Sequence, residues 1–259
     1  MRGLFVTGTD TGVGKTILSS ALLAAIAAAG ERVRAHKPVV TGLDVASEPD
    51  PSPAEAWPPD HELLARAAGM APADVAPLRY GPAVSPHLAA ALAGERIEPT
   101  QLLAAARGRA GARARGGART DSSTLADRNT RASDGESADA SIVIVEGVGG
   151  LLVPLAEDYT VRDLAAQLGL PLLIAARPGL GTINHTLLTL HAARAAGLVV
   201  RAVILTPWSD TPSVMERSNR ETIARLGNVE LAVLPFVPNA TVEALARAGA
   251  TLPWRRWLE

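Results

Sequence analysis

Residues 8–16 read GTDTGVGKT, and they stand between a short apolar run and a long run rich in alanine and leucine. A glycine-rich turn between a strand and a helix can bind phosphate, because its backbone N–H groups converge on the phosphate oxygens. Within the turn, Lys15 can reach the β- and γ-phosphates, and the Thr16 hydroxyl can ligate Mg²⁺. Gly8 lies one residue too far from the GKT ending for the standard loop, and Thr9 stands where that loop has glycine. The stretch predicts a nucleotide site.

On both sides of this turn, short β-rich apolar runs alternate with longer runs of helical period. This pattern predicts an α/β fold: one P-loop NTPase-like domain over 1–259, with a mostly parallel central sheet and helices on both faces. The expected strands are 4–7, 33–36, 142–146, 172–175, 199–205 and 231–234. The expected helices include 16–29, ended by Gly30, and 61–68, started by Pro59 and Asp60.

The composition excludes several classes of partner. The 259 residues carry 25 basic and 26 acidic side chains, a net charge of −1, so we expect no nucleic-acid partner. Without cysteine there is no disulfide framework and no thiolate zinc site. The first residues resemble no signal peptide, and the longest apolar run, 17–29, is too short to span a bilayer. We therefore expect a soluble, cytoplasmic protein without a membrane partner.

Among the 25 basic residues only Lys15 and Lys37 are lysines. Arginine is not a compact ammonium and stays protonated at useful pH, so both lysines are candidates for chemistry; the alternative is codon bias. Lys37 begins KPVVTG at the end of an expected strand. Because the carboxyl ends of parallel strands line the ligand crevice, Lys37 is expected to point toward the phosphates. The alternative is a solvated charge at a strand end.

A carboxylate follows the third expected strand, in IVIVEGVGG at 142–150. Glu146 would lie near the phosphate loop, where a carboxylate can hold Mg²⁺ directly or through water. The alternative is a buried acid that accepts hydrogen bonds from loop N–H groups. Asp60 is a further candidate metal ligand, although spacing alone makes it only one acid among 26.

Two stretches interrupt the alternating pattern. From 107 to 140, Leu125 is the only large aliphatic residue, and arginines and acids nearly cancel. We expect a flexible inserted surface loop there, because so little apolar surface cannot offset the entropy of ordering. The stretch 46–59 is rich in proline and acid, and it could close over a site or simply connect two elements.

Taken together, these motifs resemble the dethiobiotin synthetase family. The resemblance extends over nearly the whole chain except 107–140, and the lengthened phosphate loop is the family's own form. Five blocks in the family's order carry it: VTGTDTGVGKT at 6–16, KPVVTG at 37–42, SPH at 85–87, VEGVGGLLVPL at 145–155 and GTINHTLLT at 181–189.

The resemblance implies an ATP- and Mg²⁺-dependent cyclo-ligase of biotin biosynthesis. Members carboxylate 7,8-diaminopelargonic acid with CO₂, activate the carbamate with the ATP γ-phosphate as a mixed anhydride, and close the ureido ring to give dethiobiotin, ADP and phosphate. By resemblance, Lys37 and Lys15 are catalytic together with Thr11, and Mg²⁺ is held by Thr16, Asp60 and Glu146. The nucleotide-binding residues of the loop would be Gly12, Val13, Gly14, Lys15, Thr16 and Ile17.

The resemblance also implies a substrate site and a homodimer. Thr41 matches a hydroxyl position near the carbamate, and Gly149 and Gly150 match the backbone that borders the diamine. Asn184 matches the region that holds the substrate carboxylate across the dimer interface, which would make the dimer part of the active site. The alternative is that Asn184 and His185 cap a helix.

The segment for the nucleobase departs from the family. Many members have Asn-Asp where this chain reads Thr206-Pro207, and threonine cannot make the bidentate contact that asparagine makes with adenine. Pro235, Phe236 and Val237 match the base-stacking segment. The sequence therefore predicts a stacked purine with relaxed nucleotide choice.

Two other functions remain as alternatives. A partition or septum-site ATPase has the same broad fold, but it places a lysine early in the loop, where this chain has Asp10, and needs a basic face or an amphipathic C-terminal helix. An amidotransferase-type synthetase would need a glutaminase unit with a cysteine, and this chain has none.

Overall fold

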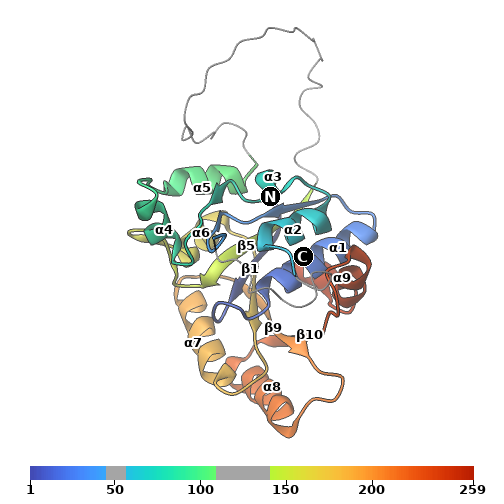
Figure 1. Ribbon diagram of the computed structural model, residues 1–259. Helices are drawn as coiled ribbons and strands as arrows, with labels where there is room; N and C mark the ends of the chain where they lie inside the picture. The colour runs from blue at the N-terminus through green and yellow to red at the C-terminus, as the bar shows by residue number, and fades with distance from the viewer. Residues whose placement is uncertain (45–56, 109–140) are drawn as a thin grey trace, which may run out of the picture.

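The computed structural model describes residues 1–44, 57–108 and 141–259. Its centre is a six-stranded sheet in the order β10-β9-β8-β1-β5-β2, in which every pair of neighbours is parallel (Figure 1). The strands are β1 (Arg2–Gly8), β2 (Val33–His36), β5 (Ile142–Gly150), β8 (Leu172–Ala176), β9 (Val200–Trp208) and β10 (Glu230–Pro235). The predicted α/β class and parallel sheet are confirmed.

Helices cover both faces of this sheet, as predicted. One face carries α1 (Lys15–Ala28), α2 (Asp60–Ala68), α3 (Pro72–Val75), α9 (Val242–Gly249) and α10 (Trp254–Trp257). The other carries α4 (Pro86–Leu92), α5 (Pro99–Ala106), α6 (Val161–Leu168), α7 (Thr182–Ala195) and α8 (Val214–Gly227). Two small sheets join β3 (Val39–Val40) to β4 (Leu78–Arg79) and β6 (Pro154–Ala156) to β7 (Tyr159–Thr160).

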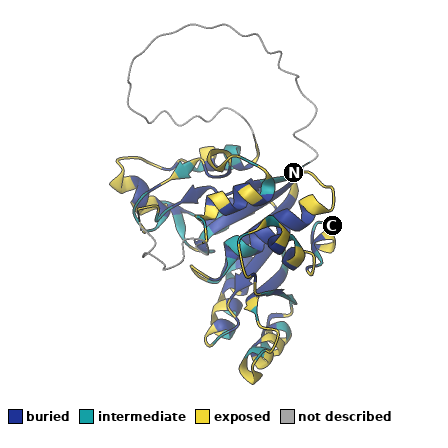
Figure 2. Ribbon diagram, turned by 45° about the vertical axis from the view of Figure 1, so that its right-hand side comes forward, coloured by how far each residue is buried: buried dark blue, intermediate teal, exposed yellow. Residues whose placement is uncertain are grey.

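The central parts of the inner strands are apolar because both faces of the sheet are covered. Leu4 and Val6 of β1 pack on the side of α1, whereas Phe5 between them packs on the opposite side, and all three are fully buried. Figure 2 shows this buried sheet between exposed helix surfaces. Such two-sided burial is the reason that the strands could be recognised as short continuous apolar runs.

Each predicted strand is present, and the main difference is at the end of β5. The prediction stops at Glu146, but the strand continues to Gly150, where it pairs with Gly8 of β1. Within this extension, Gly147 lets the strand pass close to the start of α6, since a Cβ there would lie 2.8 Å from Val161 Cγ1. The strand therefore carries Glu146 inside the sheet rather than at its edge.

The two irregular stretches lie largely outside the described residues. The expected loop at 107–140 is described only to Gly108, and the stretch at 46–59 only from Trp57. Near the chain's end, Trp254 and Trp257 are buried in the core. None of the described helices is long and apolar enough to cross a membrane.

Candidate active site

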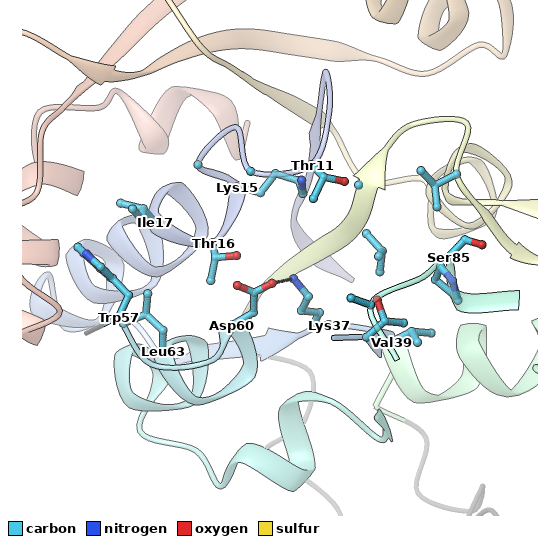
Figure 3. Close-up of a pocket in the computed structure, with 18 of the residues that line it drawn as sticks. Thr11, Lys15, Thr16, Ile17, Lys37, Val39, Trp57, Asp60, Leu63 and Ser85 are labelled. Carbon is cyan, nitrogen blue, oxygen red and sulfur yellow. Dashed lines mark hydrogen bonds and ion pairs between the residues drawn. The ribbon is translucent and has the colours of Figure 1, made fainter. Parts of the chain in front are cut away.

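A cleft of about 720 Å³ lies at the carboxyl edge of the sheet, where β1, β5 and β2 are neighbours. The phosphate loop leaves β1, and Lys37 directly follows β2, so the two lysines reach the cleft from opposite sides of β5. Figure 3 shows Lys15 and Lys37 pointing into it. Ten predicted site residues line it: Thr11, Gly12, Gly14, Lys15, Thr16, Ile17, Lys37, Thr41, Asp60 and Gly149.

The backbone conformation of the phosphate loop explains why two of its positions are glycine. Gly12 and Gly14 have φ values of 69° and 89°, in the left-handed region that favours glycine. At Gly14 a Cβ would also lie 2.8 Å from Thr206 Cγ2 at the end of β9. Helix α1 begins directly after Gly14, with no side-chain cap and no acid in its first turn, and its first residues line the cleft, so its positive end lies at the cleft. Lys15 Nζ donates to the Asp10 carbonyl oxygen at 2.8 Å.

Lys37 is the centre of a charged cluster, which we define as Thr16, Lys37, Asp60 and Glu146. Its ammonium donates to Glu146 Oε1 at 2.6 Å and to Asp60 Oδ2 at 2.5 Å (Figure 3). Thr16 Oγ1 donates to the same Glu146 oxygen at 2.8 Å. The side chains of Lys37 and Glu146 are 4% and 0% exposed, whereas that of Asp60 is 49% exposed. Solvent therefore reaches the cluster at Asp60 but not at Glu146.

The surroundings of Lys37 keep it charged. Burial alone would lower the pKa of Lys37, but the carboxylates of Glu146 and Asp60 outweigh burial and raise that pKa. For Asp60, burial acts to raise the pKa, and the neighbouring Lys37 reverses this and lowers it. For Lys15, burial prevails and lowers the pKa, despite the opposing effect of Glu146.

The donors beside Lys37 suit a hard cation. Glu146 Oε2 is buried and has no hydrogen-bond partner in the described part of the chain. Together with the Thr16 hydroxyl and the Asp60 carboxylate, it offers oxygen ligands of the type that Mg²⁺ prefers. No three His, Cys, Asp or Glu side chains gather as a metal site among the described residues, so further ligands would come from phosphate and water.

The glycines after Glu146 differ in position. Gly149, with a φ of 59°, borders the cleft next to Thr11: a Cβ there would lie 3.4 Å from Thr11 Oγ1. Gly150 pairs with Gly8 and is not among the lining residues. Val13 is buried in the core and does not line the cleft, although it borders a smaller hollow of about 300 Å³.

A second hollow, of about 790 Å³, lies at the ends of β9 and β10. Pro207 and Phe236 line it, and the Phe236 side chain is largely exposed. Pro235 pairs with Trp208 in the sheet. Thr206 and Val237 are buried, Thr206 against the phosphate loop and Val237 in the core, and neither lines this hollow.

Asn184 lies on the exposed side of α7, and the cleft and the two hollows do not include it. Helix α7 starts after Gly181 without a side-chain cap, so the interpretation of Asn184 and His185 as a helix cap is wrong. If Asn184 contacts a substrate, it does so from the surface of this chain.

The cleft contains residues that the sequence did not single out. Trp57 and Leu63 line it near Asp60, and Val39 and Ser85 lie across from them (Figure 3). Ser85 belongs to the SPH block, which is one of the five blocks of the family resemblance, but the sequence alone assigns no function to this serine. Trp57 stands in an irregular stretch without periodicity, so its proximity to the phosphate loop appears only in three dimensions.

Comparison with known proteins finds a matching family model and several named relatives. A family model described as an AAA domain matches residues 2–244. The ATP-dependent dethiobiotin synthetase BioD of Anaeromyxobacter dehalogenans (strain 2CP-C) is 39% identical over 251 residues, 95% of each chain. The enzyme of the same name from Bacillus subtilis (strain 168) is 34% identical, over 95% of this chain and 92% of its own. Among solved structures, chloroplast FtsY from Physcomitrella patens aligns with a TM-score of 0.47 and 15% identity, over 94% of this chain and 64% of its own.

Proposed function

Because the chain belongs to the family of ATP-dependent dethiobiotin synthetases, we infer that it catalyses the ATP-dependent ureido ring closure of diaminopelargonic acid in biotin synthesis. It is a ligase that forms C–N bonds and uses ATP as a substrate. The structural observation that best supports this function is the buried ammonium of Lys37. It lies 2.6 Å from Glu146 Oε1, in the cleft that the phosphate loop also lines.

We propose that Lys37 and Lys15 stabilise the negative charge of the reaction. The carbamate, its mixed anhydride with phosphate and the transferring phosphoryl group are all anionic, and fixed cations in a partly buried cleft stabilise such groups strongly. The reaction needs no protein nucleophile, which suits a chain without cysteine. Thr11 and Thr41 add hydroxyl groups along the same cleft.

Lys37→Arg tests this role. The guanidinium keeps the charge but is broader and longer, so it cannot take the same place between Asp60 and Glu146; turnover should fall by orders of magnitude. Circular dichroism and ATP binding should show a folded protein. The exposed surface variant Arg96→Lys is the control and should keep turnover. Near-normal turnover of Lys37→Arg would contradict the proposed role.

We also propose that Thr16, Asp60 and Glu146 hold Mg²⁺ with the nucleotide. The ion would neutralise the triphosphate and polarise the γ-phosphoryl group. Glu146 Oε2, which has no hydrogen-bond partner among the described residues, supports this set of donors. Calorimetry should show that Mg²⁺ strengthens ATP binding to the unmodified chain and does so much less in Thr16→Val. Equal strengthening in both proteins would argue against Thr16 as a ligand.

For the nucleobase we propose the hollow at the ends of β9 and β10, with Phe236 as a stacking ring. Because Thr206 is buried against Gly14 rather than lining this hollow, it is poorly placed to read a base edge. We expect relaxed nucleotide choice. Turnover with ATP, GTP and CTP should differ by less than about tenfold, a difference of about 1.4 kcal/mol. A strong preference for ATP would contradict this expectation.

We further propose a homodimer in the cytoplasm, with small molecules as its other partners and no nucleic acid or membrane. Leu188, which is 60% exposed, lies one helical turn after Asn184 on α7, so the two side chains share one face of the helix. Leu180, which is 95% exposed, lies in the turn just before the helix. Exposed leucines around a polar residue suit an interface that includes Asn184.

A further inference from the structure

Trp57 is a large aromatic residue that lines the cleft beside the charged cluster. Its indole lies beside Leu63 and faces Ile17 (Figure 3), and we call these three residues the apolar wall. Trp57 is 40% exposed and is not part of either core cluster. An indole that is neither buried in a core nor fully in solvent, and that lines a cleft, is available to contact what the cleft contains.

The position of Trp57 is tied to Asp60 by the chain itself. Pro58 and Pro59 separate the two residues, and proline restricts both its own φ and the residue before it. Pro59 forms the N-terminal boundary of α2, and Asp60 is the first residue of that helix. The indole therefore lies three residues before the helix start that presents the Asp60 carboxylate, with only the two prolines between them.

The members of the charged cluster differ in how far they are exposed to water. Lys37 and Glu146 are almost fully buried, whereas the Asp60 side chain is 49% exposed, so the open side of the cluster is the side of Asp60. The apolar wall lines the cleft on this side, next to Thr16 and Asp60 (Figure 3). The apolar wall therefore borders the side of the cluster that is open to solvent.

We propose that Trp57 excludes water from the phosphorylated carbamate until the second amine attacks. This proposal rests on the proposed function. In ring closure, the amine nitrogen attacks the carbonyl carbon, the C–O bond to phosphate breaks, the proton leaves the nitrogen, and phosphate departs. In the competing reaction, water attacks the same anhydride, phosphate departs, and the carbamate that remains decomposes to the free diamine and CO₂. Trp57 is thus a positioning residue that favours the amine.

The test is the ratio of phosphate released to dethiobiotin formed, measured for the unmodified chain and for Trp57→Phe, Trp57→Leu and Trp57→Ala. The ratio should be close to one with tryptophan and phenylalanine and should rise severalfold from leucine to alanine. The excess phosphate should require the diamine, because the anhydride forms only from it. Leu226→Ala, at an exposed leucine of α8, is the control and should keep the ratio of the unmodified chain.

Three results would overturn the proposal: a ratio near one in Trp57→Leu and Trp57→Ala, excess phosphate without diamine, or loss of both products together. If Trp57→Ala does not fold, Trp57→Leu alone decides. Failure of the proposed function would look different, because the unmodified chain would then form no dethiobiotin.

Discussion

At the level of single residues, the chemistry of the cleft depends on a lysine whose charged form is stabilised by two carboxylates. Asp60 and Glu146 raise the pKa of Lys37, so the ammonium stays charged throughout the pH range of an enzyme assay. Lys15 differs, because burial lowers its pKa. Any alkaline loss of activity that arises from a lysine therefore belongs to Lys15. The pair is matched to a reaction in which every stage carries negative charge.

His36, next to Lys37, makes stability depend on pH. Burial and the charge of Arg34 lower the pKa of His36 from 6.5 to about 3. The folded protein therefore keeps His36 neutral, while the unfolded chain binds a proton below pH 6.5. This contribution to stability is complete above pH 6.5 and is lost as pH falls toward 3, by about 1.4 kcal/mol per pH unit.

His36→Leu should remove that slope between pH 6 and 4. Denaturant unfolding at several pH values measures the free energy of unfolding for both proteins. His87→Gln, at an exposed position, is the control and should keep the slope of the unmodified chain. Parallel curves for His36→Leu and the unmodified chain would show that His36 does not titrate as described.

At the level of elements, the sequence predicted what local patterns determine. Strands buried on both faces are continuous apolar runs, and α1 starts at a recognisable glycine turn. The extension of β5 to Gly150 was not predictable, because it depends on pairing with Gly8, 142 residues earlier in the chain. Site residues that belong to local motifs could likewise be named from the sequence. Trp57 belongs to no motif and reaches the cleft only through long-range packing, so it could not be named.

The contact between α1 and α9 depends on one glycine. A Cβ on Gly249 would lie 2.0 Å from the Ala21 carbonyl oxygen and 2.9 Å from Ala25 Cβ. Gly249→Ala should therefore reduce the free energy of unfolding by about 3 kcal/mol, although alanine normally favours a helix. Gly179→Ala, with no atom within 4 Å of the new Cβ, is the matched control. An unchanged denaturation midpoint in Gly249→Ala would contradict this packing.

At the level of the whole molecule, the proposed dimer brings together sites that one chain holds apart. Lys37 lies in the cleft, whereas Asn184 lies on the exposed side of α7. In a symmetric dimer each cleft would combine Lys37 of one protomer with Asn184 of the other. The amino-acid composition gives no indication of a site shared between two chains. The expectation of a shared site came from the family resemblance.

Co-expression of Lys37→Arg with Asn184→Ala tests the shared site. In an equal mixture, half of the dimers carry one variant of each kind, and each of these dimers has one intact site, so about a quarter of the normal activity should return. Each variant alone should remain far less active. Activity that never exceeds the average of the two separate variants would show that the site belongs to a single chain.

The most direct measurement of the central claim follows ¹⁴C from bicarbonate into acid-stable product, with diaminopelargonic acid, Mg²⁺ and ATP, and with each omitted in turn. We expect incorporation that requires both ATP and the diamine, with the label in dethiobiotin. A folded protein that binds ATP but incorporates no label would contradict the claim, and would leave the cleft as a phosphate site for a different substrate.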